Sequence, residues 1–230
     1  MSEDLKIYPL GTTSANDLPS TSQYEHVPDF NSTSGVRWLM IGNSGSGKTL
    51  LVKSLLVRSE FGIEPTFGEN RFIVSDTIDM DSSWDDLQLP KHHKIAWDAG
   101  VVQQIMDYSK KSKTGICMVL DDLISNASAI NKTRGSLLTK LFVQGRHWKV
   151  RGLFICTQKY NGLPPVIREQ CTHCCVFKLN NKRERESFFE DFAIEGIEAA
   201  YHEATSVPYG FLFIDKNKQK CYANFERELI

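Results

Sequence analysis

One glycine-rich segment, GNSGSGKT at residues 42–49, has the residue types and spacing of a loop that binds phosphate. It fits the pattern G-x-x-x-x-G-K-[ST], in which glycines allow backbone N–H groups to approach anionic oxygens at the start of a helix. Lys48 is expected to reach the β- and γ-phosphates of ATP, and Thr49 to hold Mg²⁺ through its hydroxyl. The predicted phosphate-binding residues are Gly42, Asn43, Ser44, Gly45, Ser46, Gly47, Lys48, Thr49 and Leu50.

A Gly/Ser linker could match the same pattern by chance. The flanking sequence argues against this, because the apolar run at residues 38–41 precedes the glycines and apolar residues at helical spacing follow them. A strand, a glycine-rich turn and a helix in this order form the structural context that the phosphate-binding pattern requires.

Three predicted strands end in an aspartate that could support a metal ion: Asp76, Asp98 and Asp121. We favour Asp121, because its apolar run is the longest and only there does a second acid follow directly. Asp121 is expected to hold Mg²⁺ through water, and Asp122 to face the γ-phosphate and orient or deprotonate the attacking water. Alternatively, these acids cap the next helix or lie in a solvated turn. Paired acids favour hydrolysis over phosphoryl transfer to a small molecule, since a kinase must exclude water.

A glutamine follows another predicted strand, at the end of the segment GRHWKVRGLFICTQ. Gln158 lies beside the phosphate loop if the strand at residues 153–156 neighbours the first strand. It could then sense the γ-phosphate or position water. A surface amide just past a strand is the alternative.

The elements that must position these residues follow from hydrophobic periodicity. Short apolar runs alternate with helical patterns from Val36 onward, which predicts an α/β fold with a mainly parallel central sheet flanked by helices. Strands are predicted at residues 37–42, 72–75, 94–97, 116–120, 153–156 and 174–179, and helices at 48–57, 101–109, 136–146, 183–192 and 195–204. The terminal segments GFLFID and KCYANF, joined by KNKQ, predict an antiparallel β-hairpin at one edge of the sheet.

Composition narrows the class of protein. The chain has 230 residues, of which 41% are hydrophobic, enough for one α/β domain with a real core. Its net charge of −1 means that any positive charge for nucleic acid must be local, in a groove or pore. Six cysteines, mostly in apolar runs, indicate buried thiols in a reducing compartment. The start of the chain is not typical of a secretory signal, and no apolar stretch approaches the ~20 residues of a membrane span. We therefore expect a soluble intracellular protein.

Residues 1–34 are rich in Ser, Thr, Asn and Pro and have no periodicity. They are predicted to form a flexible N-terminal arm, followed by an ATPase domain over residues 35–230.

Several other polar or ligating segments carry weaker signals. The segment CTHCC contains a C-x-x-C, but a structural zinc site needs four ligands and no second pair follows, so Cys174 and Cys175 are expected to be core thiols. The basic segments KHHK, KKSK and NNKRERES are expected to be solvated, with contacts to DNA as the alternative.

The order of four segments, GNSGSGKT, MVLDDL, GRHWKVRGLFICTQ and LPPVIRE, resembles the DNA-packaging ATPases of the FtsK–HerA superfamily. It is most similar to the poxvirus-type ATPases of large DNA viruses and their relatives with double-jelly-roll capsids, over about residues 36–180. The resemblance implies a P-loop NTPase fold of the RecA-like, additional-strand type. It further implies an ATP-hydrolysing ring, expected to be a hexamer, that moves double-stranded DNA of any sequence into a preformed capsid.

The same resemblance implies residue roles and partners. Gln158 becomes the sensor glutamine, and Asp121 and Asp122 form the second phosphate-loop motif, where family members often have Glu in place of Asp122. A neighbouring subunit supplies an arginine, for which Arg146 is the first candidate and Arg168 the second. A surface salt bridge or a DNA phosphate contact is the alternative for either arginine. The implied partners are DNA and a capsid or portal-vertex protein. The implied location is the host cytoplasm or the viral assembly site, with association with the virion also open.

Two other functions remain open from the sequence. One is a different FtsK–HerA-type motor for DNA or secretion. The other is a nucleotide-dependent capsid-assembly module, for which residues 1–34 could be the docking arm.

Overall fold

The computed structural model describes residues 26–28, 30, 34–123, 126, 129–130 and 136–230. Most of the predicted N-terminal arm therefore lies outside the described residues. Phe30 belongs to that segment, yet it is buried and packs against the rings of Trp38 and Phe154, with centroid separations of 6.2 Å and 6.1 Å. An apolar ring so placed joins the hydrophobic core.

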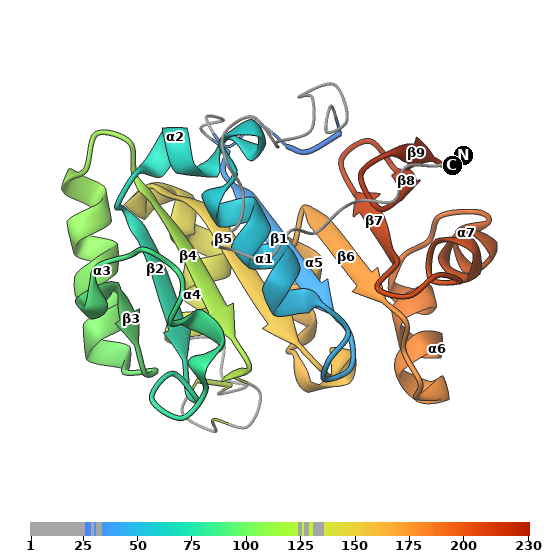
Figure 1. Cartoon of the computed structure of the whole chain (residues 1–230), viewed down its shortest axis with the longest axis horizontal. Helices are drawn as coiled ribbons and strands as arrows, with labels where there is room; N and C mark the ends of the chain where they lie inside the picture. The colour runs from blue at the N-terminus through green and yellow to red at the C-terminus, as the bar shows by residue number, and fades with distance from the viewer. Residues whose placement is uncertain (1–25, 29, 31–33, 124–125, 127–128, 131–135) are drawn as a thin grey trace.

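A single mixed sheet runs through the described part of the chain (Figure 1). Its strands are β1 (Val36–Ile41), β2 (Arg71–Ser75), β3 (Lys94–Ile95), β4 (Ile116–Asp121), β5 (Val150–Thr157), β6 (His173–Phe177), β7 (Phe211–Asp215), β8 (Lys220–Ala223) and β9 (Arg227–Glu228). They lie in the order β3-β2-β4-β5-β1-β6-β7-β8-β9. Strands β1 to β6 are parallel, and β7, β8 and β9 continue the sheet in antiparallel pairing.

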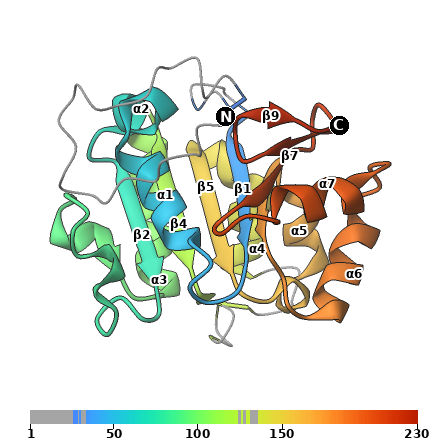
Figure 2. The ribbon, with the colours of Figure 1, turned by 45° about the vertical axis from the view of Figure 1, so that its right-hand side comes forward.

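Helices cover both faces of the sheet, and the two views of the ribbon show the resulting layers (Figures 1 and 2). The first face is covered by α1 (Lys48–Val57) and α2 (Ile63–Phe67), and the second by α3 (Ala99–Lys111), α4 (Leu137–Gln144), α5 (Pro165–Gln170), α6 (Lys182–Asp191) and α7 (Ile197–Ala204). Alternate residues of β1 serve the two cores: Trp38 and Met40 pack toward α1, whereas Leu39 and Ile41 pack toward the other layer. This double burial explains why the parallel strands are continuous apolar runs.

The strand order brings the site residues together. By register, β5 lies between β1 and β4, because Val36 pairs with Gly152 and Leu120 pairs with Ile155. The carboxyl ends of these parallel strands therefore meet at one edge, where α/β proteins place their ligands. This arrangement confirms the predicted α/β fold with an additional strand between the phosphate-loop strand and the acidic strand.

Most predicted elements are confirmed, with differences at their ends. Helix α1 has the predicted bounds, and the C-terminal hairpin is present as β7 and β8. Strand β3 is shorter than predicted and ends at Ile95, because the side chain of Asp98 already caps α3 by accepting from the backbone N–H of Val101. Helix α7 begins at Ile197, because Gly196 before it has a φ of 80°. The short helices α2 and α5 are not predicted by the sequence patterns.

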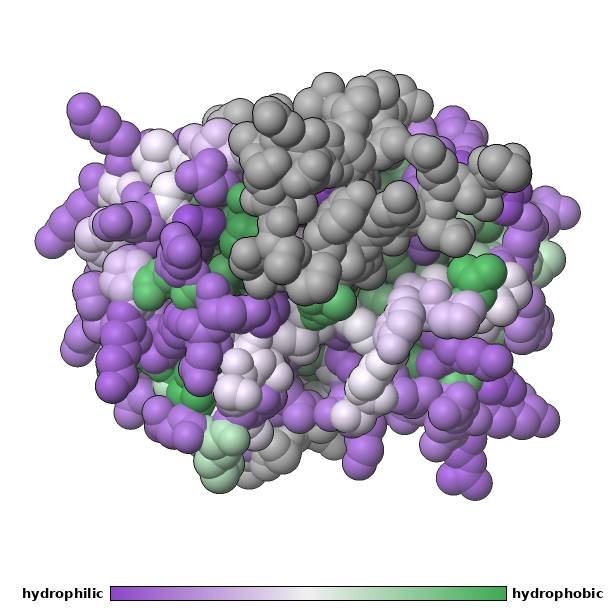
Figure 3. Space-filling view, viewed as in Figure 1, coloured by the Kyte–Doolittle hydropathy of each residue, from purple (hydrophilic) through white to green (hydrophobic). Residues whose placement is uncertain are grey.

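The cysteines are buried, and the visible surface is mostly polar (Figure 3). All six cysteines are buried free thiols, and Cys174 and Cys175 lie inside β6 as predicted core thiols. The face shown in Figure 3 is largely hydrophilic outside its grey part, with hydrophobic residues scattered among polar ones. Across the described residues, no helix combines the length and apolar character needed to cross a bilayer.

Candidate active site

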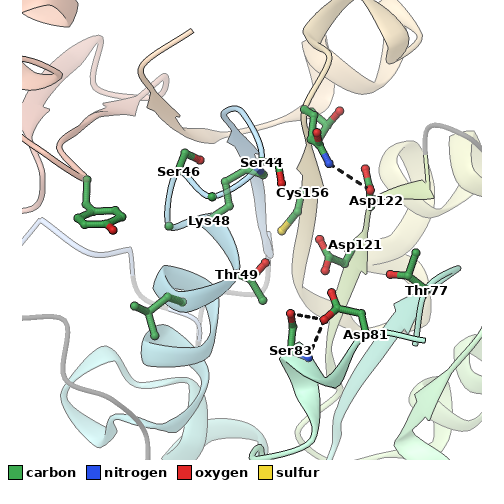
Figure 4. Close-up of a pocket in the computed structure, with 16 residues that line it drawn as sticks. Ser44, Ser46, Lys48, Thr49, Thr77, Asp81, Ser83, Asp121, Asp122 and Cys156 are labelled. Carbon is green, nitrogen blue, oxygen red and sulfur yellow. Dashed lines mark hydrogen bonds between the residues drawn. The ribbon is translucent and has the colours of Figure 1, made fainter. Parts of the chain in front are cut away.

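A cavity of about 410 Å³ opens at the carboxyl edge of the sheet, between the phosphate loop and the ends of β4 and β5 (Figure 4). Its walls come from the predicted loop, from the ends of these strands and from the segment after β2. The lining residues are Ser44, Gly45, Ser46, Gly47, Lys48, Thr49, Leu50, Thr77, Asp81, Ser83, Asp121, Asp122, Cys156, Thr157, Gln158 and Tyr209. The predicted residues Lys48, Thr49, Asp121, Asp122 and Gln158 thus share one cavity.

The backbone of the phosphate loop has the conformation that its glycines allow. Gly45 and Gly47 have φ values of 72° and 101°, in the left-handed region that side chains disfavour. At Gly42 a Cβ atom would lie 2.8 Å from Cβ of Phe177, so only glycine fits there. Among the described residues no side chain caps the N-terminus of α1, and its first N–H groups remain available for an anion.

The ammonium group of Lys48 lies over its own loop. Its Nζ donates to the backbone oxygens of Gly42 and Asn43, at 2.7 Å and 2.8 Å. Burial lowers the pKa of Lys48, an effect opposed by the facing acids Asp121 and Asp122. A bound phosphate oxygen would exchange with these carbonyl acceptors and remain beside the same charged group.

Asp121 ends β4 and is buried at the base of the cavity, across from Thr49 (Figure 4). The indole Nε1 of Trp84 donates to its Oδ2 at 3.0 Å, which fixes the orientation of the carboxyl group. Burial raises the pKa of Asp121 to about 6, and the neighbouring Asp122 adds to this, against the opposing effects of Trp84 and Lys48. A cation bound at this carboxylate would relieve the cost of its burial.

Asp122 and Gln158 are hydrogen-bonded across the mouth of the cavity. Gln158 follows β5, and its Nε2 donates to Oδ2 of Asp122 at 3.3 Å. The backbone of Asp122 has a φ of 50°, a left-handed conformation that Asp tolerates better than most residues. The amide and the second acid therefore lie side by side.

The other two strand-ending acids have different partners. Asp98 is the N-cap of α3. Asp76 accepts a hydrogen bond from Nδ2 of Asn126, at 2.8 Å. Neither lines the cavity.

The donor set suits magnesium. Mg²⁺ prefers hard oxygen ligands and usually takes few from the protein, with the rest from phosphate and water. Thr49 offers a hydroxyl and Asp121 a carboxylate to the same cavity. No cluster of three or more His, Cys, Asp or Glu residues that could hold a metal by itself occurs within the described ranges. The residues therefore fit a metal that binds together with the nucleotide.

Arg146 lies far from the phosphate loop of its own chain. It belongs to the turn at Gly145–Trp148 before β5, whereas Gln158 follows that strand. An eight-residue strand spans roughly 25 Å, which exceeds the reach of an arginine. The side chain is exposed, and within the described residues no hydrogen bond or ion pair engages it.

Arg168, on α5, is held within its own chain. Its guanidinium forms an ion pair with Asp191 and lies 4.5 Å from the ring centroid of Tyr160, whose hydroxyl donates to the same carboxylate at 2.7 Å. The side chain is 13% exposed. This environment favours the salt-bridge alternative for Arg168.

Sequence reasoning missed several residues of the site. Trp84 contacts Asp121 from 37 positions away in the sequence, and Asp81 lines the cavity while accepting hydrogen bonds from the Ser83 N–H and hydroxyl. These residues follow β2, which pairs directly with β4. The polar segment that follows β2 could have indicated that Asp81 and Ser83 lie near the acidic end of β4. Tyr209 enters from the loop before β7, and no motif marks it.

Comparison with known proteins identifies the relatives of this chain. A family model described as "Poxvirus A32 protein" matches residues 31–200, which include the whole phosphate loop, both acids, Gln158 and both arginines. The chain belongs to the poxvirus A32 protein family. The predicted resemblance to poxvirus-type packaging ATPases is thereby confirmed.

The A32 family member described here has relatives in large DNA viruses. It is 25% identical over 202 residues to the uncharacterized protein 075L of Invertebrate iridescent virus 6, covering 83% of this chain and 74% of that protein. It is 26% identical over 203 residues to the uncharacterized protein 015R of Frog virus 3, where the match spans 80% of this chain but only 58% of the relative.

The fold is similar to solved structures of a genome packaging NTPase, B204 from Sulfolobus turreted icosahedral virus 2. The structure with sulfate gives a TM-score of 0.62 at 18% identity, covering 81% of this chain and 94% of B204. The structure with AMPPCP gives a TM-score of 0.60 at 19% identity, covering 81% and 95%. At this identity the similarity establishes the P-loop NTPase fold.

Proposed function

We propose that this chain is the subunit of an ATP-hydrolysing motor that translocates double-stranded DNA into a preformed viral capsid. The observation that carries the proposal is the shared cavity of the phosphate loop, the paired acids and the glutamine, in a member of the poxvirus A32 family. Similarity to the genome packaging NTPase B204 and its AMPPCP complex supports it.

The residues of the cavity that the sequence predicts each have a chemical role in this proposal. The N–H groups of the phosphate loop and Lys48 bind the β- and γ-phosphates. Asp122 orients the attacking water and accepts its proton, and Gln158, already bonded to Asp122, holds the water in line with the γ-phosphate. Thr49 and Asp121 would hold Mg²⁺, which would supply positive charge against the charge that develops on the phosphate oxygens.

A ring of subunits completes the site. Arg146 cannot reach the nucleotide of its own chain, so its charge acts on the γ-phosphate bound by a neighbour. In related phosphoryl-transfer systems, an arginine supplied by a second protein or subunit raises the turnover rate by ~10³–10⁵-fold. A hexamer is the expected ring, and the capsid or portal-vertex protein its docking partner.

DNA is bound through its phosphates, without base contacts, because a packaging motor must accept any sequence. With a net charge of −1, the chain must gather its positive charge locally around a central pore. The motor is proposed to act inside the infected cell at the viral assembly site.

ATPase rates with and without long double-stranded DNA test this function. Wild type is expected to hydrolyse ATP faster with DNA. Asp122→Asn is expected to bind ATP with unchanged affinity but to lose turnover by about 10²–10⁴-fold, because it cannot take a proton from water. Asp98→Asn is the matched control, since that acid caps α3 and should leave the turnover unchanged. A rate indifferent to DNA, or normal turnover in Asp122→Asn, would contradict the proposal.

A further inference from the structure

A second cavity of about 410 Å³ lies on the other side of the phosphate loop. It is formed by the end of β6 and the loop between α7 and β7. Its lining residues are Gly45, Ser46, Phe177, Lys178, Thr205, Ser206, Val207, Pro208, Tyr209 and Gly210. Three of these, Gly45, Ser46 and Tyr209, also line the first cavity, so the two spaces meet at the phosphate loop.

The two sides of the phosphate loop differ in chemistry. The side of β4 presents Asp81, Asp121 and Asp122, which suit a metal and a reacting phosphate. The second cavity is lined by aromatic, aliphatic and small residues, and Lys178 is the one charged residue among those described in its walls. A nucleotide whose phosphates occupy the loop must place its nucleoside on one side, and the apolar side suits a base.

Tyr209 stands at the junction of the two cavities with its side chain exposed. Its residue is 66% exposed, and its Cδ1 atom would lie 3.4 Å from a Cβ placed on Gly47 of the phosphate loop. Its backbone has a φ of 60°, which is unusual for a bulky residue and recurs at functional sites. An exposed ring in a strained conformation beside a phosphate loop calls for a ligand that covers it.

The loop that carries Tyr209 is held firmly. The N–H of Gly210 donates to the carbonyl of Val207 at 3.1 Å, and a Cβ on Gly210 would lie 2.3 Å from the carbonyl oxygen of Ala204. The loop therefore packs against the end of α7 so closely at Gly210 that no side chain fits at that position. On the facing wall, Asn43 Nδ2 donates to the carbonyl of Lys178 at 3.0 Å and ties the phosphate loop to the end of β6.

Two hydroxyl groups in this cavity, those of Thr205 and Ser206, are already engaged. Thr205 Oγ1 donates to the carbonyl of Tyr201 at 2.8 Å, and Ser206 Oγ donates to that of Glu203 at 2.7 Å. The Oγ of Ser46 has no hydrogen-bond partner among the described residues, but it is buried within the phosphate loop against Gly42. Sites that discriminate strongly between related ligands do so with buried groups that require a hydrogen-bond partner. A base in this cavity is instead recognised by its flat face, which every nucleobase possesses.

We propose that the second cavity holds the nucleoside of the bound nucleotide, that Tyr209 stacks on its base, and that the site therefore accepts ATP and GTP alike. This proposal rests on the proposed function, because it assumes that the phosphates bind at the phosphate loop.

The test compares nucleotides with a ligand that has no base. Calorimetry of the full chain with Mg²⁺ would measure the Kd for ADP, GDP and inorganic tripolyphosphate. For Tyr209→Gly we expect ADP and GDP to bind about 10- to 100-fold more weakly, and tripolyphosphate to bind as it does to wild type. Glycine suits a positive φ, so this variant should fold at least as well as wild type. Tyr209→Phe, which keeps a stacking ring, should bind all three ligands as wild type does.

Tyr108→Ala is the matched control, because Tyr108 is also an exposed tyrosine, on α3, and its hydroxyl donates to Asn70. It should change no affinity. Equal losses for ADP and tripolyphosphate in Tyr209→Gly, or no loss for either, would overturn the stacking role. A preference of wild type for ADP over GDP by more than about 100-fold would overturn recognition by the flat face alone. If wild type bound none of the three ligands, the proposed function itself would fail.

Discussion

The two ends of β5 differ in how their polar residues are held. At the carboxyl end, the charged candidates of the active site already have partners: Lys48 bonds to its loop carbonyls, Asp121 to Trp84, and Asp122 to Gln158. At the amino end, Arg146 is exposed, with no hydrogen bond or ion pair to its side chain among the described residues. A preorganised half-site and an exposed arginine on opposite edges suit the proposed ring, in which sites are completed between subunits.

The largest expected effect comes from the preorganised end. Lys48→Ala removes the charge proposed to bind the β- and γ-phosphates, and ATP turnover should fall by about 10³-fold or more. The fold should survive, because the Nζ of Lys48 bonds to carbonyls of its own loop. Steady-state turnover together with circular dichroism would check both statements.

Lys53→Ala is the control on the same helix. Lys53 forms an ion pair with Asp86 and does not line the cavity, so turnover per folded molecule should persist. Full turnover in Lys48→Ala would remove the phosphate loop from the mechanism.

The next effect concerns the exposed arginine, Arg146. Arg146→Ala should lower DNA-stimulated turnover by about 10³–10⁵-fold, because in the proposed ring the neighbour's γ-phosphate loses a cation. Mixing it with Asp122→Asn should restore part of the activity, since a mixed ring contains interfaces with an intact acid on one side and an intact arginine on the other. His147→Ala, an exposed neighbour, should behave as wild type. Without recovery on mixing, the assignment of Arg146 to a neighbouring site would be wrong.

A smaller effect is expected for Arg168, and the experiment distinguishes its role from that of Arg146. Arg168→Ala removes the ion pair to Asp191 and the contact with Tyr160, and should lower the free energy of unfolding by about 1–3 kcal/mol. Urea denaturation would measure this loss, and a double-mutant cycle with Asp191→Asn would assign it to the pair. Turnover per folded molecule should change little. Loss of turnover with recovery on mixing would instead give Arg168 the role proposed for Arg146.

The smallest effect lies in the hairpin, away from both ends of β5. Burial alone would raise the pKa of Asp215, but the imidazole of His173, whose Nε2 lies 3.8 Å from Oδ1, and the Lys218 N–H lower it to about 2. A carboxyl group with a folded-state pKa below its ordinary value of 3.8 stabilises the fold above that pH. We expect about 1–2 kcal/mol of stability to be lost as the pH falls from about 4 to about 2.

Urea unfolding at pH 5 and pH 3 would measure the contribution of the Asp215 carboxylate to the free energy of unfolding. Asp215→Asn should be less stable than wild type at pH 5, and the difference should shrink at pH 3. A difference that is independent of pH would rule out this carboxylate as its source.

The parts of the molecule that the sequence predicts are those fixed by local pattern. The phosphate loop and α1 follow from glycine spacing and helical periodicity, and Asp121, Asp122 and Gln158 follow from strand ends in a parallel sheet. Contacts between distant segments were not predicted. The sequence gives no sign that Trp84 reaches Asp121, that Asp191 holds Arg168, or that Tyr209 stands beside Gly47. These depend on how loops pack on the sheet, and short loops carry little periodicity.

Strand β5 has a mechanical consequence for a ring. It is hydrogen-bonded along its length to β1 and β4, so it is stiff, and Gln158 follows one end while Arg146 precedes the other. When the γ-phosphate departs, Gln158 would move, and β5 would transmit this movement to Arg146 at its other end. Arg146 would then shift relative to the nucleotide bound by the adjoining subunit. In the proposed motor, β5 therefore couples hydrolysis in one subunit to hydrolysis in the next, so that the subunits act in sequence.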